Sequence, residues 1–314
     1  MTRIIVIALV IAAACFPVRA EDMIGADRTA PPPASEESVP AVLSGTLKQV
    51  RERGAVTIGF RAASFPFSFV KPGSPQPLGY SIDLCLGIVD EVVRALNGAA
   101  IRTAYAPVTP DTRIAAVMSG QVDLECGSTT ANAERQNSVA FSPIIYVAGT
   151  KLLVKRSSGI GSYRDLRGKT LVVTSGTTNE AAMKQLNDKR GLRIAIVSAR
   201  DHDASYAMLA AGQADAFATD DVLLYGLVAA RAAQATMAVV GDFITYEPYG
   251  IMFRRDDPQM AAVVSRAFRT MAQRRSLAAT YRRWFLQPTP TGEVLNLPMS
   301  VQLAEVFRSL VAED

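Results

Sequence analysis

One short pattern occurs twice in this chain. Residues 118–125 read MSGQVDLE, and residues 210–217 read AAGQADAF. In each copy a helical pattern ends at the glycine and a short strand begins, with polar residues following at 128–130 and at 219–221. Two copies of one helix–strand unit predict two α/β lobes rather than a single doubly wound sheet.

The segments around the two copies alternate between helix and strand patterns. Before the first copy we expect helices and strands in turn, over residues 46–53, 55–60, 79–97, 101–106 and 109–120. Between the copies we expect a helical turn, a strand, a helix and a strand, at 132–136, 169–174, 177–186 and 193–197. Because ligands bind beyond the carboxyl ends of strands in open α/β sheets, two facing lobes would place the polar ends of both repeats across one cleft.

The composition narrows the possible functions. The chain has 314 residues, 49% of them hydrophobic, which is enough to form large buried cores. A single histidine excludes a metal site built on several imidazoles, and three cysteines are too few for a disulfide-built scaffold. We predict no metal site and no cofactor. The formal charge of +4 is spread along the chain without a long basic run, so nucleic acid is not an expected partner.

The first twenty residues have the pattern of a secretory signal peptide. Arg3 precedes an apolar run over residues 4–16, and a small-x-Ala motif ends at Ala20. The run is too short to span a bilayer, and a buried N-terminal helix is the alternative. Residues 11–15 (IAAAC) also resemble a bacterial lipoprotein box, which would make Cys15 a lipidated first residue. In both secretory readings the protein leaves the cytosol, and the Pro-rich segment 21–44 is predicted to be disordered.

Polar and basic residues follow the strands of the first predicted lobe. Ser128 and Thr130 end the first repeat, and Arg135 lies in the helical turn just after them. A guanidinium group binds a carboxylate through two parallel hydrogen bonds, so Arg135 is a candidate carboxylate contact; the alternative is a solvated surface arginine. Arg61 follows the first strand, and Arg113 falls in the first turn of the helix predicted from residue 109.

The second predicted lobe contributes a helix N-terminus and two acids. Thr177 and Glu180 have capping-box spacing, so the loop before Thr178 is expected to point its N–H groups outward. Such a terminus holds a carboxylate, although the same pattern also occurs as an ordinary cap. Asp220 ends the strand of the second repeat, where a carboxylate would match an ammonium group. Asp221 could take that role instead, or either acid could cap the next helix.

Together these residues predict a positively charged cleft. Arg61, Arg113 and Arg135 would face a single acid, Asp220. A zwitterion with a carboxylate side chain carries one net negative charge, and its second carboxylate would match Arg61 and Arg113. The only histidine, His202, lies between two aspartates and is either a further donor or a structural residue.

The sequence motifs of phosphate-binding loops and of nucleophilic enzymes are incomplete or absent in this sequence. The residues GKT at 168–170 look like part of a phosphate-binding loop, but Tyr163 stands where that loop needs its first glycine. The chain has no G-x-S-x-G nucleophile elbow, and nothing places a nucleophile beside His202. The sequence therefore predicts a binding protein with no catalytic residue.

From Thr46 to its end the chain resembles the bacterial solute-binding proteins of polar amino-acid ABC transporters, known as extracellular solute-binding protein family 3. Within this family it is most similar to the glutamate/aspartate-binding proteins. The resemblance rests on GYSIDL at 79–84, DLECGSTT at 123–130, Glu134-Arg135, VTSGTT at 173–178, Asp201-His202 and Asp220-Asp221. The CGSTT and TSGTT segments are specific to the acidic-ligand branch of the family.

The resemblance implies the α/β fold of two-lobed, type II periplasmic binding proteins, with the ligand in the interlobe cleft and two hinge crossings. With the signal peptide at 1–20 and the disordered segment at 21–44, it implies lobe 1 at 45–148 and 246–314, and lobe 2 at 149–245. The crossings would lie near residues 147–151 and 242–246. The return of the chain to lobe 1 follows only from the resemblance.

The resemblance also implies ligand contacts from each lobe. Arg135 would bind the main-chain carboxylate of the ligand, and Ser128 and Thr130 would be further contacts from lobe 1. Thr177 and Thr178 would be contacts from lobe 2.

The remaining contacts concern the ammonium group and the side chain of the ligand. Asp220 would bind the ammonium group, and Arg61, Arg113 and His202 would bind the side-chain carboxylate. Pro110 replaces a serine that the acidic-ligand branch can use, which removes one donor. The discrimination between glutamate and aspartate therefore stays open.

Two cysteines, Cys85 and Cys126, fall in the same lobe and in an oxidising compartment. They form either a disulfide or two buried thiols.

The resulting prediction is a monomeric periplasmic protein that binds L-glutamate or L-aspartate and delivers it to an inner-membrane ABC permease. One alternative is a cyclohexadienyl or prephenate-type dehydratase on the same fold, which needs a carboxylic acid over the leaving group. Glu247 is the only acid near the second crossing, and nothing in the sequence places it in the cleft. The other alternative is a ligand sensor that docks on a receptor.

Overall fold

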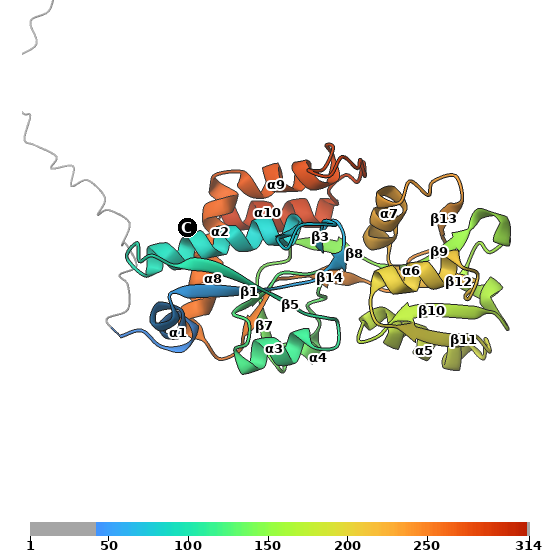
Figure 1. Cartoon of the computed structure of the whole chain (residues 1–314), viewed down its shortest axis with the longest axis horizontal. Coiled ribbons are helices and arrows are strands. Elements are labelled where there is room, and N and C mark those ends of the chain that lie inside the picture. Colours follow the sequence, from blue (N-terminus) through green and yellow to red (C-terminus); the bar gives the residue numbers. More distant parts are fainter. Residues whose placement is uncertain (1–41, 313–314) are drawn as a thin grey trace, which may run out of the picture. The chain divides into compact units, whose positions relative to one another are not determined.

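The computed structural model describes residues 42–312 of the chain (Figure 1). The predicted signal peptide, the lipoprotein-box residue Cys15 and most of the Pro-rich segment lie outside the described residues. Over the described part the elements form two five-stranded sheets, each with its own helices. None of the helices in this part is both long enough and apolar enough to cross a membrane.

The first sheet has the strand order β5-β1-β6-β15-β7. Its strands are β1 (Ala55–Phe60), β5 (Arg102–Pro107), β6 (Leu124–Glu125), β7 (Val139–Phe141) and β15 (Met252–Arg254). Strand β1, between β5 and β6, runs parallel to both, while β15 runs antiparallel to β6 and β7. Because β15 comes after the strands of the second sheet along the chain, the chain returns to the first sheet.

Helices cover both faces of the first sheet (Figure 1). They are α1 (Gly45–Arg53), α2 (Tyr80–Ala95), α3 (Arg113–Ser119), α4 (Ala133–Gln136), α8 (Pro258–Gln273), α9 (Ser276–Phe285) and α10 (Val301–Ala312). The long helix α2 packs against α8 and α9 because its inner face is apolar, with Leu84, Ile88 and Val92 fully buried. A small sheet of β2 (Ala63–Ser64), β3 (Ser68–Val70) and β4 (Pro77–Leu78) precedes α2.

The second sheet repeats the arrangement of the first, with the order β11-β10-β12-β9-β13. Its strands are β9 (Thr150–Lys155), β10 (Thr170–Thr174), β11 (Ala195–Ala199), β12 (Ala216–Asp220) and β13 (Met237–Val240). As in the first sheet, the second strand in this order, β10, is parallel to its two neighbours β11 and β12, and β9 is antiparallel to β12. Its helices are η1 (Arg156–Ser158), η2 (Tyr163–Leu166), α5 (Thr178–Arg190), α6 (His202–Ala210) and α7 (Asp221–Ala230).

The repeated sequence pattern has a structural cause. Gly120 and Gly212 end helices α3 and α6 with the same positive φ of 75°. The aspartate of each copy then clamps the start of a central strand. The Asp123 carboxylate accepts the N–H of Thr57 at 2.7 Å, and the Asp215 carboxylate accepts the N–H of Thr170 at 2.8 Å. The backbone N–H of each aspartate donates to the carbonyl of the same threonine.

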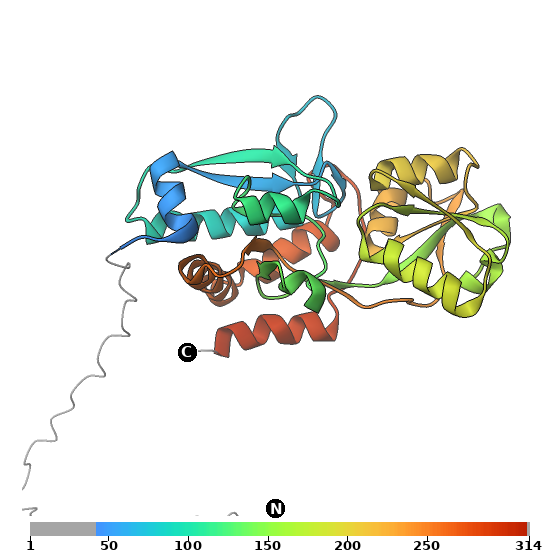
Figure 2. The same ribbon diagram turned by 90° about the horizontal axis from the view of Figure 1, so that it is seen from below.

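The chain passes between the two sheets at a two-stranded antiparallel ribbon, β8 (Tyr146–Ala148) with β14 (Glu247–Tyr249) (Figure 2). The first predicted crossing overlaps β8. The second lies just before β14, where Ile244 donates its N–H to the carbonyl of Thr150.

One predicted helix begins later than the sequence suggested. Thr109 and Pro110 were expected at the N-terminus of a helix, but α3 begins at Arg113. The Thr109 hydroxyl accepts the N–H of Thr112 at 3.2 Å, and the Thr112 hydroxyl accepts the N–H of Thr109 at 2.9 Å. These two bonds hold a turn in place of a helical start, although Arg113 still lies in the first turn of α3.

Cys85 in α2 and Cys126, which follows β6, are joined by a disulfide. The bond ties α2 to the strand end that leads to Ser128 and Thr130.

Candidate functional site

A small polar cavity lies where residues of the two halves meet. Its wall is formed by Arg61, Arg113, Ser128, Thr130, Thr177, Thr178, Asn179, His202, Asp220 and Leu223. The cavity volume is about 10 Å³, which is about the space of one water molecule. Eight of the nine residues that the sequence proposed as ligand contacts are on this wall, all except Arg135. Asn179 and Leu223 are additional wall residues.

Two buried arginines form the cationic part of the wall. The Nη1 atom of Arg113 donates to the Thr129 hydroxyl at 2.5 Å, and that hydroxyl donates to Oε2 of Glu125 at 2.7 Å. Burial lowers the pKa of Arg113 and lowers that of Arg61 to about 9, the nearby Arg113 charge adding to the effect on Arg61. An arginine side chain keeps its charge at neutral pH, so both guanidinium groups are charged.

Three wall residues carry buried polar atoms without a hydrogen-bond partner among the described residues. These atoms are Nη2 of Arg61, Nε of Arg113 and Oγ of Ser128. A buried polar group without a partner costs free energy, so such atoms in a native protein call for an explanation. Two donors and a hydroxyl on one wall are suited to an anionic oxygen.

Arg135 lies beside the cavity and does not line it. It is buried in α4, where Asn132 caps the helix, and its Nη1 donates to the carbonyl of Thr130 at 3.0 Å. Burial and the Arg113 charge lower its pKa to about 10. Its guanidinium group thus contacts a wall residue, Thr130, without itself lining the cavity.

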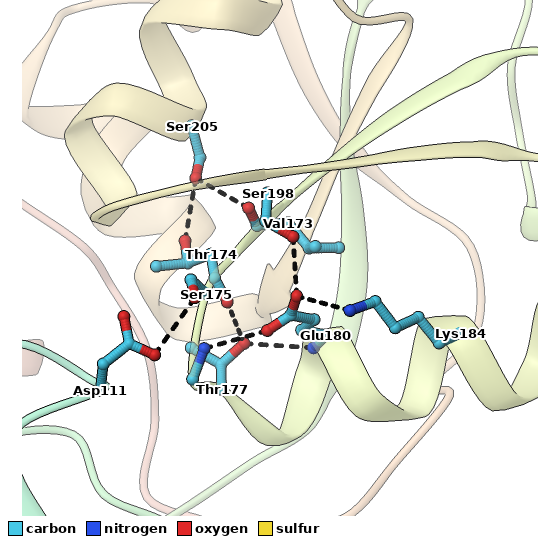
Figure 3. A network of polar contacts seen from close by, with 10 residues as sticks. Asp111, Val173, Thr174, Ser175, Thr177, Glu180, Lys184, Ser198 and Ser205 are labelled. Atoms are coloured by element: carbon cyan, nitrogen blue, oxygen red, sulfur yellow. Dashed lines mark hydrogen bonds and ion pairs between the residues drawn. The ribbon is translucent and has the colours of Figure 1, made fainter.

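The loop between β10 and α5 ends at Thr177 and Thr178, which line the cavity. Figure 3 shows the polar contacts around this loop. Thr177 is the N-cap, since its hydroxyl accepts the N–H of Glu180 at 3.1 Å. The Glu180 carboxylate accepts the N–H of Gly176 at 3.0 Å, one residue earlier than in a regular capping box. Lys184 and Ser198 donate to the other oxygen of Glu180, which fixes this side chain outside the cavity.

The same loop touches the first half of the molecule (Figure 3). The hydroxyl of Ser175 donates to Oδ1 of Asp111 at 3.1 Å. A Cβ atom at Gly176 would lie 2.3 Å from that oxygen and 2.9 Å from the Asp111 backbone nitrogen. Gly176 also has a φ of 70°. Both its conformation and this close approach therefore require glycine.

His202 begins α6 and is buried on the cavity wall. Its Nδ1 lies 2.8 Å from the hydroxyl of Thr174, which also contacts the Ser205 hydroxyl at 2.9 Å. Burial, followed by the charges of Arg61 and Arg113, lowers its pKa well below the usual value. The imidazole is therefore neutral at pH 7.

Asp220 supplies a carboxylate to the wall. Its Oδ1 accepts from the amide of Asn179 at 2.7 Å, and its Oδ2 accepts from the hydroxyl of Tyr249. Burial and, next, the nearby Glu247 raise its pKa to about 7. Asp221 does not line this cavity, and it accepts the N–H of Gly149 at 3.3 Å.

Two buried acids that the sequence analysis left out of the site stand behind the wall. Glu125 is fully buried, and it is within electrostatic reach of Arg61 and Arg113. Glu247 is buried too, and its Oε2 accepts from Thr130 at 2.6 Å and from Thr178 at 2.8 Å. Asp220 is thus the one acid on the wall, and Glu125 and Glu247, which nothing in the sequence placed at the cleft, add two acids behind it.

A larger cavity, about 430 Å³, lies along the β8–β14 ribbon. Its wall is mainly aromatic and aliphatic and includes Tyr146, Phe243, Tyr246 and Leu297. None of the unpartnered buried polar atoms found in residues 42–312 is on this wall. In the same part of the chain no cluster of His, Cys, Asp and Glu side chains could hold a metal ion. The polar cavity is therefore the candidate site.

Comparisons with known proteins place the chain among solute-binding proteins. The model of the bacterial extracellular solute-binding proteins, family 3, matches residues 56–287. An L-glutamate/L-aspartate-binding protein of Pseudomonas aeruginosa is 42% identical over 268 residues, which cover 85% of this chain and 89% of the relative. A glutamate/aspartate import solute-binding protein of Escherichia coli is 35% identical, covering 89% of this chain and 91% of the relative.

Solved structures show the same fold. A substrate-binding protein of an ABC uptake transporter from Streptococcus pneumoniae, with bound histidine, superimposes with a TM-score of 0.69 at 21% identity, covering 78% of this chain and 97% of its own. An ancestral amino-acid-binding protein described as a precursor of cyclohexadienyl dehydratase is 28% identical with a TM-score of 0.65, covering 76% and 99%.

Proposed function

The chain belongs to family 3 of the bacterial extracellular solute-binding proteins, and we propose that it binds L-glutamate and L-aspartate for import by an ABC transporter. It has the type II periplasmic-binding-protein fold. The relatives with the same ligand class in their names cover nearly the whole of the described chain.

The observation that carries this proposal is the set of unpartnered polar atoms on the cavity wall. Arg61 and Arg113 each keep one buried donor without a partner among the described residues, and Ser128 keeps its hydroxyl. A carboxylate oxygen would satisfy these donors and compensate the burial of two charges. A neutral side chain, such as that of leucine, would leave them unpaired.

The residue roles follow from this placement. Arg61, Arg113, Ser128 and His202 would hold the side-chain carboxylate of the ligand, with His202 acting as a neutral hydrogen-bonding group. Asp220 would hold the ammonium group.

The main-chain carboxylate of the ligand would bind on the opposite side of the cavity, at the start of α5. Thr177 and the backbone N–H groups at the start of α5 lie there, and Arg135 is the nearest further cation. Arg135 would reach this carboxylate by exchanging its bond to Thr130 for a bond to the ligand.

A cavity of about 10 Å³ cannot admit an amino acid without opening. We propose that residues 45–148 and 246–314 move as one lobe against residues 149–245, with the β8–β14 ribbon as the hinge. Closure would exclude water and strengthen the charge interactions.

The cellular context is also a proposal. Extracellular solute-binding proteins act outside the cytosol, and the N-terminal pattern of this chain supports a periplasmic location, with lipidation at Cys15 as the alternative. We propose that it works as a monomer with an inner-membrane permease. Neighbouring permease and ATPase genes would support this role over that of a receptor-bound sensor.

A dehydratase activity is the competing proposal. One structural neighbour is described as a precursor of such an enzyme, and Asp220 places a carboxyl group on the cavity wall with Glu247 behind it. In this structure, however, Glu247 lies behind the wall and its Oε2 is engaged by two threonine hydroxyls, so it is not poised over a leaving group in the cavity. We expect no turnover of prephenate when product formation is followed by absorbance.

The decisive experiment is a thermal-shift screen of the secreted protein against the twenty amino acids and several dicarboxylates, followed by calorimetry. We expect the largest stabilisation with L-glutamate and L-aspartate. Stabilisation by arginine, histidine or glutamine with no response to glutamate would refute the proposed ligand.

A further inference from the structure

We propose that Glu247 is a positioning residue that makes the site require a protonated amine on its ligand. This inference rests on the proposed function, and it assigns a role to a residue that does not itself line the cavity. The inference is about whether the threonine hydroxyls on the wall act as donors or as acceptors toward the ligand.

Glu247 joins the two halves of the site through one oxygen atom. It begins β14, is buried, and accepts at Oε2 from the hydroxyl of Thr130 and from the hydroxyl of Thr178. Thr130 follows the first repeat, and Thr178 is the first residue of α5. Both threonines line the cavity.

The direction of these bonds decides what the threonines offer to a ligand. A hydroxyl group has one hydrogen to donate, whereas an ionised carboxylate only accepts. Thr130 and Thr178 therefore both donate their hydroxyl hydrogen to Glu247. Toward the cavity they present only lone pairs, which accept from an ammonium group and repel a carboxylate.

Asp220 extends this acceptor surface. Its two oxygens accept from Asn179 and Tyr249, and each keeps a further lone pair. An ammonium group has three donors, so it matches Asp220 together with the two threonine hydroxyls. Glu247 thus sets the polarity of the subsite from behind, and Asp220 completes it.

The charges around Asp220 support the same assignment. Glu247 and Asp221 bring further negative charge to it, while Arg113, Arg135 and the Tyr249 hydroxyl face it from the other elements. Burial and Glu247 raise the pKa of Asp220. A bound ammonium group would stabilise the ionised form and so release a proton on binding.

The chain offers a matched control for Glu247. Glu293 also accepts from two threonine hydroxyls, those of Thr289 and Thr291, but it does not line the site. Replacing Glu293 removes the same kind of contact at a place where no ligand binds.

The test compares L-glutamate with glutarate, which has the same two carboxylates and no amine. Calorimetry measures both affinities for the parent protein, Glu247→Met, Glu247→Gln and Glu293→Met. Methionine keeps the length of the side chain and accepts hydrogen bonds only weakly, so both hydroxyls regain a free hydrogen. We expect Glu247→Met to lower the preference for glutamate over glutarate at least tenfold, chiefly by weakening glutamate binding. Glu293→Met leaves the preference unchanged.

The pH profile is a second readout that a purely structural role would not move. In the parent protein we expect glutamate affinity to fall as the pH is lowered from 8 to 6, because Asp220 takes up a proton. Glu247→Gln keeps an oxygen acceptor but removes the neighbouring charge, so the fall should move to lower pH.

Several results would overturn the inference. Equal weakening of glutamate and glutarate in Glu247→Met would show that Glu247 only holds the fold, as would an unchanged preference. If the parent protein fails to bind glutamate, the proposed ligand is wrong, and the same ratio is then measured with whichever amino acid binds and its deaminated analogue. A parent protein that binds a deaminated analogue as tightly as its amino acid would refute the amine requirement itself.

Discussion

The two sheets have the same strand order but supply the site with different charges. Arg113 and His202 are the first residues of α3 and α6, the helices that follow the outer parallel strands β5 and β11. At these equivalent positions the first half places a buried cation, and the second half places an imidazole kept neutral by burial and by the arginines. The repeated scaffold fixes where a side chain enters the cavity, and the residue type fixes its charge.

The comparison predicts its largest effect at Arg113. Replacing it by alanine removes a charged contact to the side-chain carboxylate, so glutamate affinity should fall by about 2–5 kcal/mol in calorimetry. Arg53→Ala is the control, because Arg53 pairs with Asp123 in the same half and does not line the cavity. Parent-like binding by a folded Arg113→Ala variant would remove Arg113 from the site.

The two halves also differ in that only the first contains a disulfide. The Cys85–Cys126 disulfide closes a segment with a sequence separation of 41 in the first half, whereas the second half has no cysteine. The double variant Cys85→Ala/Cys126→Ala should lose about 2–4 kcal/mol of unfolding free energy in a urea titration. If the variant unfolds at the parent midpoint both with and without reductant, the disulfide contributes nothing to stability.

The parts of the fold that the sequence predicted are those set by local patterns. Strand β1 and the capping threonine Thr177 follow from periodicity and from residues three apart. The repeat pointed to equivalent strand ends, and the aspartates that clamp β1 and β10 explain why it recurs. The sequence could therefore predict that polar residues at or just after the ends of these strands lie together, and Ser128, Thr130 and Asp220 do line the cavity.

The missed residues depend on contacts between distant parts of the chain. Glu247 lies 117 residues from Thr130 and 69 from Thr178, and only the second crossing of the chain brings them together. Glu125 gave a weak signal, an acid within an otherwise apolar strand segment, since a buried acid needs partners. Its link to Arg113 through Thr129 depends on how α3 packs beside β6, which local patterns do not specify.

Contact between the halves gives a smaller predicted effect. Gly176→Ala would place a methyl group against Asp111, so closure should be hindered and glutamate affinity reduced by about 1–3 kcal/mol. Gly168→Ala is the matched control, because Gly168 has the same φ of 70° and a Cβ atom added there would meet nothing within 4 Å. Equal affinity losses in the two variants would attribute the effect to backbone strain and contradict the proposed closure contact.

His202 gives the smallest predicted effect and tests the charge difference directly. A neutral imidazole contributes an ordinary hydrogen bond, so His202→Ala should weaken glutamate binding by about 1 kcal/mol at both pH 8 and pH 6. A loss confined to pH 6 would mean that the imidazole is charged when ligand binds.

The same substitution also changes how the stability of the protein depends on pH. Because burial lowers the pKa of His202, the unfolded chain binds a proton below pH 6.5 that the folded protein does not. The parent should therefore lose stability below pH 6.5 more steeply than His202→Ala, as thermal unfolding at pH 7.5 and pH 5.5 would reveal.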